Sequence, residues 1–158
     1  MPILIADAAG ASAALVFIAS NMRARDAEEI YGMRWDDDPE AVAYETRQAI
    51  EMGTGRVFHH ESEPVAVCGA VEIHPGVFSA FAYGTDRWRH VVKAVAVYSL
   101  LDLKPWCAER GHRVECKSRW NHKTAHLWLE SLGATMEGVL YKFGKDGADY
   151  YQFAWTRD

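Results

Sequence analysis

The hydrophobic period of the chain changes near Gly53, and this change constrains the fold more than any other feature of the sequence. Before it, apolar side chains recur at helical spacing, which predicts helices over residues 8–21, 21–31 and 39–52. After it, the spacing is that of strands separated by short turns, over residues 55–61, 65–73 and 77–83. Three strands in direct succession predict an antiparallel meander, so the chain is neither all-helical nor all-β.

The second half of the chain alternates between the two periods. It predicts a helix over 89–109, a strand over 113–118, a helix over 123–132 closed by Gly133, and hairpin strands over 137–143 and 150–156. Pro105 should kink the first of these helices or end it early. A further short strand is expected over residues 3–6.

The strands at 77–83 and 113–118 flank a crossover helix and are expected to be parallel neighbours, whereas the other pairs are antiparallel. The predicted fold class is α/β: one domain over residues 1–158, with a mixed, mostly antiparallel sheet of about six or seven strands and helices on both faces.

Composition fits an ordinary globular domain, with 49% hydrophobic and 25% charged residues. Three scattered cysteines are too few for a disulfide framework, which favours the reducing cytoplasm. The apolar segment 3–20 is interrupted by Asp7 and lacks a basic start, so it is predicted to be core rather than a signal peptide or a membrane span.

Charge is distributed unevenly. Residues 1–84 contain 5 Lys and Arg against 13 Asp and Glu, whereas residues 85–158 contain 12 against 9. A basic strip between Arg87 and Lys123 on an acidic protein is typical of a specific anionic ligand rather than of nucleic-acid binding, although a solvated mixed surface explains it equally well.

The segment from His122 to Ala134, His-Lys-Thr-Ala-His-Leu-Trp-Leu-Glu-Ser-Leu-Gly-Ala, resembles the N-x-x-A-x-x-L-Y-x-x-L-G-F segment of the GNAT (GCN5-related N-acetyltransferase) fold. The order of elements resembles that fold along nearly the whole chain. The resemblance implies an N-acetyltransferase that uses acetyl-CoA on a small amine or a protein lysine. The cofactor would lie in the splay between the strands at 77–83 and 113–118.

A narrower resemblance is to small GNAT-like proteins of tailed bacteriophages, including the family of the T7-type internal virion protein A. It rests on residues 21–23, 29–31, 35, 38–39, 75–77, 84–88 and 126–134. This resemblance implies a second function, a virion or assembly protein without catalysis that contacts phage structural proteins. The expected location is then a bacterial host cell or the virion. The six tryptophans would fill the core or supply such an interface.

In GNAT enzymes a glycine-rich Q/R-x-x-G-x-G/A loop holds the pyrophosphate of CoA, but residues 85–92 contain no glycine. Two alternatives follow. Backbone N–H groups around Trp88–His90 hold the phosphates with help from Arg87 or Arg89, or Thr85 or Asp86 caps the helix, Trp88 packs and no CoA binds. The candidate cofactor-binding residues are Tyr83, Thr85, Arg87, Trp88, Arg89, His90 and His122.

Leu129 stands where the resemblance implies a tyrosine acid. Tyr141, Tyr150 or Tyr151 of the final hairpin could substitute for it, and Tyr141 is the candidate we name. The candidate bases are Glu72 and His74, whose spacing of two puts them on one face of a strand. His122 and His126 are four apart, a spacing that can hold zinc, and a third ligand would have to be Cys116 or His112. No H-E-x-x-H motif or cysteine pair accompanies them, so no metal is expected. Acetyl-CoA and an amine are the partners if the chain is an enzyme, with no nucleic acid and no membrane.

Overall fold

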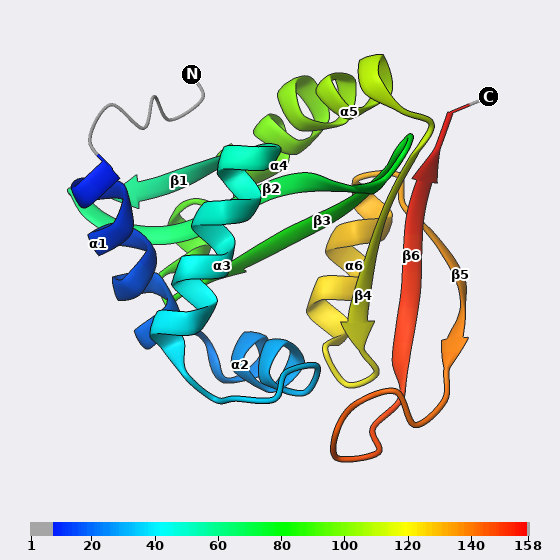
Figure 1. Ribbon diagram of the computed structural model, residues 1–158, viewed down its shortest axis with the longest axis horizontal. Helices are drawn as coiled ribbons and strands as arrows, with labels where there is room; N and C mark the ends of the chain where they lie inside the picture. The colour runs from blue at the N-terminus through cyan, green and yellow to red at the C-terminus, as the bar shows by residue number, and fades with distance from the viewer. Residues whose placement is uncertain (1–7, 158) are drawn as a thin grey trace.

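A computed structural model describes residues 8–157, so the strand predicted over 3–6 lies outside the described residues. Within them one sheet has the order β1-β2-β3-β4-β6-β5 (Figure 1). Its strands are β1 Thr54–His60, β2 Glu63–His74, β3 Val77–Gly84, β4 Arg113–Arg119, β5 Thr135–Leu140 and β6 Tyr150–Thr156. Among the strands of residues 8–157, β3 and β4 are the only pair that runs in parallel. The predicted mixed sheet and its parallel pair are confirmed.

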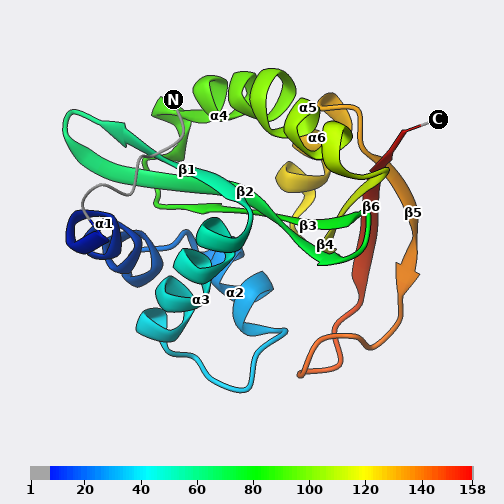
Figure 2. The same ribbon diagram turned by 45° about the horizontal axis from the view of Figure 1, so that its top comes forward.

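Helices cover both faces of the sheet, as predicted. Figure 2 shows α1 Ala8–Ser20, α2 Ala24–Tyr31 and α3 Pro39–Met52 on one face, and α4 Val92–Tyr98 and α5 Lys104–Arg110 on the other. The last helix, α6 Lys123–Ser131, packs Leu129 against Phe153 of β6. Gly133 ends it at a φ of +89°, the left-handed conformation that its glycine was predicted to supply.

The core under α1 and α3 forms because each helix presents an apolar stripe to the sheet. Leu15 and Ile18 are buried against Val42 and Val67, so the apolar N-terminal segment is core where the structure describes it. Asp38 starts α3 by accepting a hydrogen bond from the Glu40 N–H at 3.0 Å. Between residues 8 and 157 no helix has the length and apolar character that a membrane crossing requires.

The helix predicted over 89–109 differs from the structure in its regularity. A 3₁₀ turn at Trp88–His90 precedes α4, and a π-helical turn at Ser99–Leu103 joins α4 to α5. In that turn the Lys104 N–H donates to the Ser99 carbonyl, five residues back. Pro105 cannot donate and its ring would clash with the carbonyl four residues earlier, so a widened turn accommodates it. The helix then continues to Arg110.

The predicted helix over 21–31 starts later, at Ala24. Met22 instead forms an isolated bridge with Thr85, and the Arg23 N–H donates to the Gly84 carbonyl at 2.9 Å. The linker between α1 and α2 therefore pairs with the end of β3. It can do so because β4 pairs only with Val77–Ser79, which leaves the far end of β3 without a neighbouring strand on the β4 side.

Candidate functional site

The two parallel strands separate along their length. They pair only where Val77–Ser79 meet Arg113–Glu115, and beyond that point they diverge into a V (Figure 1). A cavity of about 780 Å³ fills the V and reaches both faces of the sheet, since side chains of α2 line it on one face and side chains of α6 on the other. The splay that the GNAT resemblance implied is thus present.

Two carboxylates on α2 face this cleft. Asp26 and Glu29 are three residues apart and so lie on one side of the helix. Asp26 is 2% exposed and accepts hydrogen bonds from the Gly84 N–H at 3.0 Å, from Arg23 Nε at 2.9 Å and from His122 Nε2 at 2.8 Å. One carboxylate thereby joins α2, the end of β3 and the start of α6.

Asp26 contacts the end of β3, whereas Glu29 contacts the end of β4 on the other side of the V. Glu29 Oε1 accepts a hydrogen bond from the Arg119 backbone N–H at 2.7 Å. Burial raises the pKa of Glu29, against the weaker lowering effects of the nearby Ser118 hydroxyl and His122. A carboxyl group with a raised pKa that lines a cleft is a candidate proton acceptor. Sequence reasoning missed it, although its spacing from Asp26 was a signal that both share one helix face.

The other face of the cleft holds a free hydrogen-bond donor. Trp128 Nε1 is buried and has no hydrogen-bond partner among residues 8–157, and Trp128 lines the cavity. An indole N–H can only donate, and buried donors are nearly always paired. The arrangement is therefore suited to a ligand that brings an acceptor oxygen into the cleft beside Leu129.

The segment that replaces the glycine-rich loop is a compact turn. Thr85 Oγ1 accepts from the Arg87 N–H at 3.3 Å and the Thr85 carbonyl from the Trp88 N–H at 3.0 Å. Trp88 packs edge-on against Trp128 with ring centroids 5.8 Å apart, and the Arg23 guanidinium lies over it at 4.4 Å. The packing of Trp88 agrees with the second of the two alternatives for this loop, but neither the 3₁₀ turn nor α4 begins with a side-chain cap from Thr85 or Asp86.

The basic residues of this turn point in different directions. Arg87 forms ion pairs with Glu61 in the β1–β2 turn and with Glu63 at the start of β2, and it does not line the cleft. Arg89 lines the cleft and has no ion pair in the described part of the chain. His90 stacks on His60, with ring centroids 4.2 Å apart, outside the cleft.

Of the seven candidate cofactor residues, the cavity is lined by Tyr83, Trp88, Arg89 and His122. The Tyr83 hydroxyl forms a hydrogen bond with the Thr46 hydroxyl on α3, with 2.7 Å between the two oxygens. Burial raises the pKa of Tyr83 to about 12. His122 is 3% exposed and is bonded to Asp26, so its role in the cleft is to hold that carboxylate.

The three candidate catalytic residues lie away from the cleft. Glu72 and His74 stand at the end of β2 next to the narrow end of the V, where Glu72 accepts from the Gly76 N–H at 2.7 Å and closes the turn. Tyr141 is 79% exposed, beyond the end of β5. None of the three lines the cavity. The spacing of Glu72 and His74 predicted that they share one face of a strand. It did not predict that this strand ends beside the paired end of β3 and β4, away from the open part of the cleft.

Gly84 makes the packing of Trp88 possible. A Cβ atom there would lie 2.6 Å from Trp88 Cε3 and 2.9 Å from the Val65 carbonyl oxygen. We expect Gly84→Ala to lower the free energy of unfolding by roughly 1–3 kcal/mol and to shift the tryptophan fluorescence, measured by chemical denaturation. The control is Gly138→Ala in β5, where a Cβ meets nothing within 4 Å. Equal stability of the two variants would contradict the packing described.

No protein-family model matches the chain, and no curated protein matches its sequence. Solved structures match its fold. An aminoglycoside 6′-acetyltransferase type Ii has a TM-score of 0.68 and 15% identity, with 99% of this chain and 95% of that one covered. A ribosomal-protein-alanine N-acetyltransferase from Brucella melitensis has a TM-score of 0.67 and 16% identity, with 94% and 95% covered. A GNAT-family acetyltransferase from Streptococcus pneumoniae has a TM-score of 0.57 and 11% identity, with 76% and 77% covered. The chain has the GNAT fold.

Proposed function

We propose that this protein is an N-acetyltransferase that uses acetyl-CoA and accepts an amine, with Glu29 as the proton acceptor. The observation that carries the proposal is the open cleft between β3 and β4, which reaches both faces of the sheet and has on one of them a partly buried carboxyl group with a raised pKa. Two proteins of similar fold are named N-acetyltransferase and aminoglycoside acetyltransferase, which supports an amine as the acceptor.

The residues of the cleft fit acetyl-CoA in two respects and depart from the family pattern in one. The unpaired edges of β3 and β4 can hydrogen-bond to an extended amide chain, and Trp128 Nε1 supplies a further donor. The turn at 85–91 has no glycine and Trp88 fills its inner side, so backbone donors cannot close on a pyrophosphate there. Arg89, which lines the cleft without an ion pair, is the residue we assign to the phosphates.

When bound, acetyl-CoA supplies a thioester whose carbonyl carbon an amine nitrogen can attack, which forms a C–N bond and releases the thiol. Glu29 takes the proton that the nitrogen loses, because its raised pKa makes it a stronger base than an ordinary glutamate. The same carboxyl group can return that proton to the sulfur, which balances the reaction without the tyrosine that Leu129 replaces. Trp128 Nε1 donates to an oxygen on the opposite side of the cleft.

Binding of the acyl donor tests this proposal. We expect saturable heat in calorimetry with acetyl-CoA up to millimolar concentration, and a loss of at least about tenfold in affinity for Ala82→Trp, because Ala82 lines the cleft. Leu127→Trp is the control, since Leu127 is 68% exposed on α6 and does not line the cavity. No heat with the unmodified protein, or equal affinity in both variants, would contradict the proposal.

A contact function in a phage particle is the second candidate, and an exposed tryptophan favours it. Trp35 is fully exposed on the loop between α2 and α3, and ion pairs of Arg34 with Asp36 and of Lys145 with Asp37 hold this loop in place. Tryptophan is a common anchor of protein interfaces. Mass spectrometry of purified phage particles separates the two functions: the enzyme is expected in the bacterial cytoplasm, and the contact protein in the particle.

A further inference from the structure

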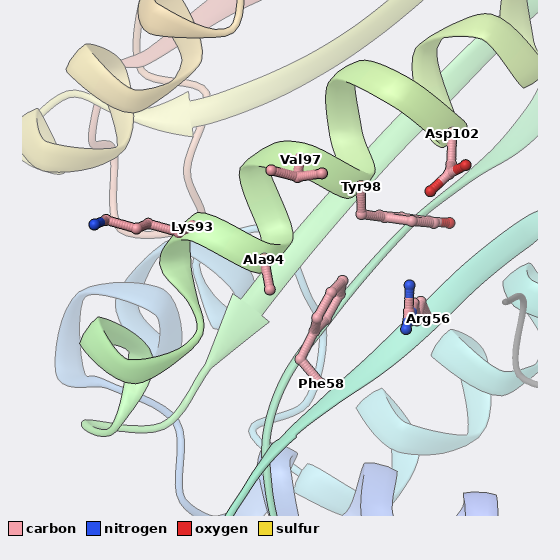
Figure 3. A pocket seen from close by; sticks show the side chains of 7 residues that line it. All are labelled: Arg56, Phe58, Lys93, Ala94, Val97, Tyr98 and Asp102. Atoms are coloured by element: carbon pink, nitrogen blue, oxygen red, sulfur yellow. The ribbon is translucent and has the colours of Figure 1, made fainter.

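A second pocket lies apart from the cleft, between β1 and the helix formed by α4 and the π-helical turn (Figure 3). Its volume is about 330 Å³, and it shares no lining residue with the cleft. Phe58 and Val97 form its apolar walls, and Arg56, Tyr98 and Asp102 converge at one end (Figure 3). The volume is at the lower end of the range for ligand pockets, roughly 300–1,000 Å³, which suits a ligand with a single ring.

The polar end of this pocket contains a hydroxyl group without a partner. Tyr98 is 5% exposed, and its hydroxyl oxygen is buried and makes no hydrogen bond within residues 8–157. Burial raises the pKa of Tyr98 to about 12, and the nearby Thr54 side chain opposes this rise without reaching hydrogen-bond geometry. The group therefore keeps its proton and is a donor that lacks an acceptor. Buried tyrosine hydroxyls usually have a hydrogen-bond partner.

The charges around the pocket favour an anion. Arg56 has its guanidinium 5.5 Å from the centre of the Phe58 ring and forms no ion pair with any described carboxylate. Lys93, on the rim, also has no ion pair in the part of the chain that the structure describes. Asp102 is the one acidic residue among the described residues of the lining, so the pocket carries a net positive charge.

We propose that this pocket binds a small organic monocarboxylate with an aromatic body. The carboxylate accepts hydrogen bonds from the Tyr98 hydroxyl and the Arg56 guanidinium, and the ring packs between Phe58 and Val97. A charge-assisted bond to an otherwise unpaired buried donor satisfies the hydroxyl and gives the pocket its preference for an anion. Asp102 opposes binding at short range and so limits the affinity.

Titration with benzoate tests the proposal, with benzyl alcohol and benzylamine as the neutral and cationic probes of the same size. Nuclear magnetic resonance chemical shifts of residues 93–102 report the binding. We expect saturable binding of benzoate that is about tenfold weaker in Tyr98→Phe and in Arg56→Gln, and severalfold tighter in Asp102→Asn. Benzylamine should not saturate. Ala82→Trp, which fills the other cavity, should leave benzoate binding unchanged.

Tyr98→Phe also separates binding from folding. Because it removes a buried hydroxyl without a partner, its melting temperature should equal or exceed that of the unmodified protein while its benzoate affinity falls. Three results would overturn the proposal: no saturable benzoate binding, the same affinity in Tyr98→Phe and Arg56→Gln as in the unmodified protein, or benzylamine binding as tightly as benzoate. None of them depends on whether acetyl-CoA binds.

Discussion

Replacing Asp26 by alanine is expected to lower the free energy of unfolding by about 3–5 kcal/mol, the cost of leaving buried charged partners unpaired. The carboxylate is the shared acceptor for Arg23, for His122 and for the backbone N–H of Gly84. Without the Asp26 carboxylate, both the buried His122 imidazole and the Gly84 N–H lose their hydrogen-bond partner. Chemical denaturation of the two proteins measures the difference.

Glu28→Ala is the matched control on the same helix. Glu28 is exposed; it pairs with Arg25 at 3.3 Å, accepts a hydrogen bond from Asn121 Nδ2 at 3.3 Å and lies 4.0 Å from Arg119 Nε. Because these contacts are at the surface, removal of Glu28 should change the free energy of unfolding by less than about 1 kcal/mol. If Asp26→Ala were no more destabilised than this control, the buried carboxylate would not be what joins α2 to β3 and α6.

The second large effect is expected on catalysis. Glu29→Gln keeps the shape of the side chain and its hydrogen bond from the Arg119 N–H, but an amide cannot accept the proton of the amine. If the proposed function is right, acetyl transfer should fall by roughly 10²–10⁴-fold at saturating acetyl-CoA, measured by release of the thiol. Activity within a few-fold of the unmodified protein would exclude Glu29 as the base.

Stability should respond in the opposite direction. The folded-state pKa of Glu29 is raised, so the stability that its protonated form contributes is present at low pH and is lost as the pH rises through the raised pKa. At neutral pH glutamine avoids the cost of a buried charge, so Glu29→Gln should melt at the same or a higher temperature. Activity of the unmodified protein should increase with pH over the same range. The melting comparison holds even if no acetyl transfer is detected.

Much of the fold could be predicted because its signals are local. The change of period at Gly53, the cap at Asp38 and the glycine at Gly133 each act within a few residues of the chain. The start of α2 and the π-helical turn were not predicted, because each depends on a distant or cumulative contact. Met22 pairs with Thr85, more than sixty residues away along the chain.

The candidate site was harder to predict, since its residues meet only in the fold. Asp26 and His122 are separated by 96 residues, and nothing in the sequence around either one indicates the other. The position of the cleft was implied by the resemblance to the GNAT fold, and the absence of glycine from residues 85–92 is visible in the sequence itself. The carboxyl groups that line the cleft come from α2, and the apolar spacing that predicts this helix does not distinguish Asp26 and Glu29 from its other charged residues.

The π-helical turn between α4 and α5 contains one residue more than a regular helical turn. Its hydrogen bond joins the Lys104 N–H to the Ser99 carbonyl, five residues back, whereas an α-helical bond spans four. Deleting one residue between 99 and 103 would therefore let the turn close as an α-helix, with α5 in its present orientation and Cys107 still in the core. Pro105 would then meet the carbonyl four residues earlier. Proteins that share this core are therefore expected to lack the extra residue where no proline stands at the position of Pro105.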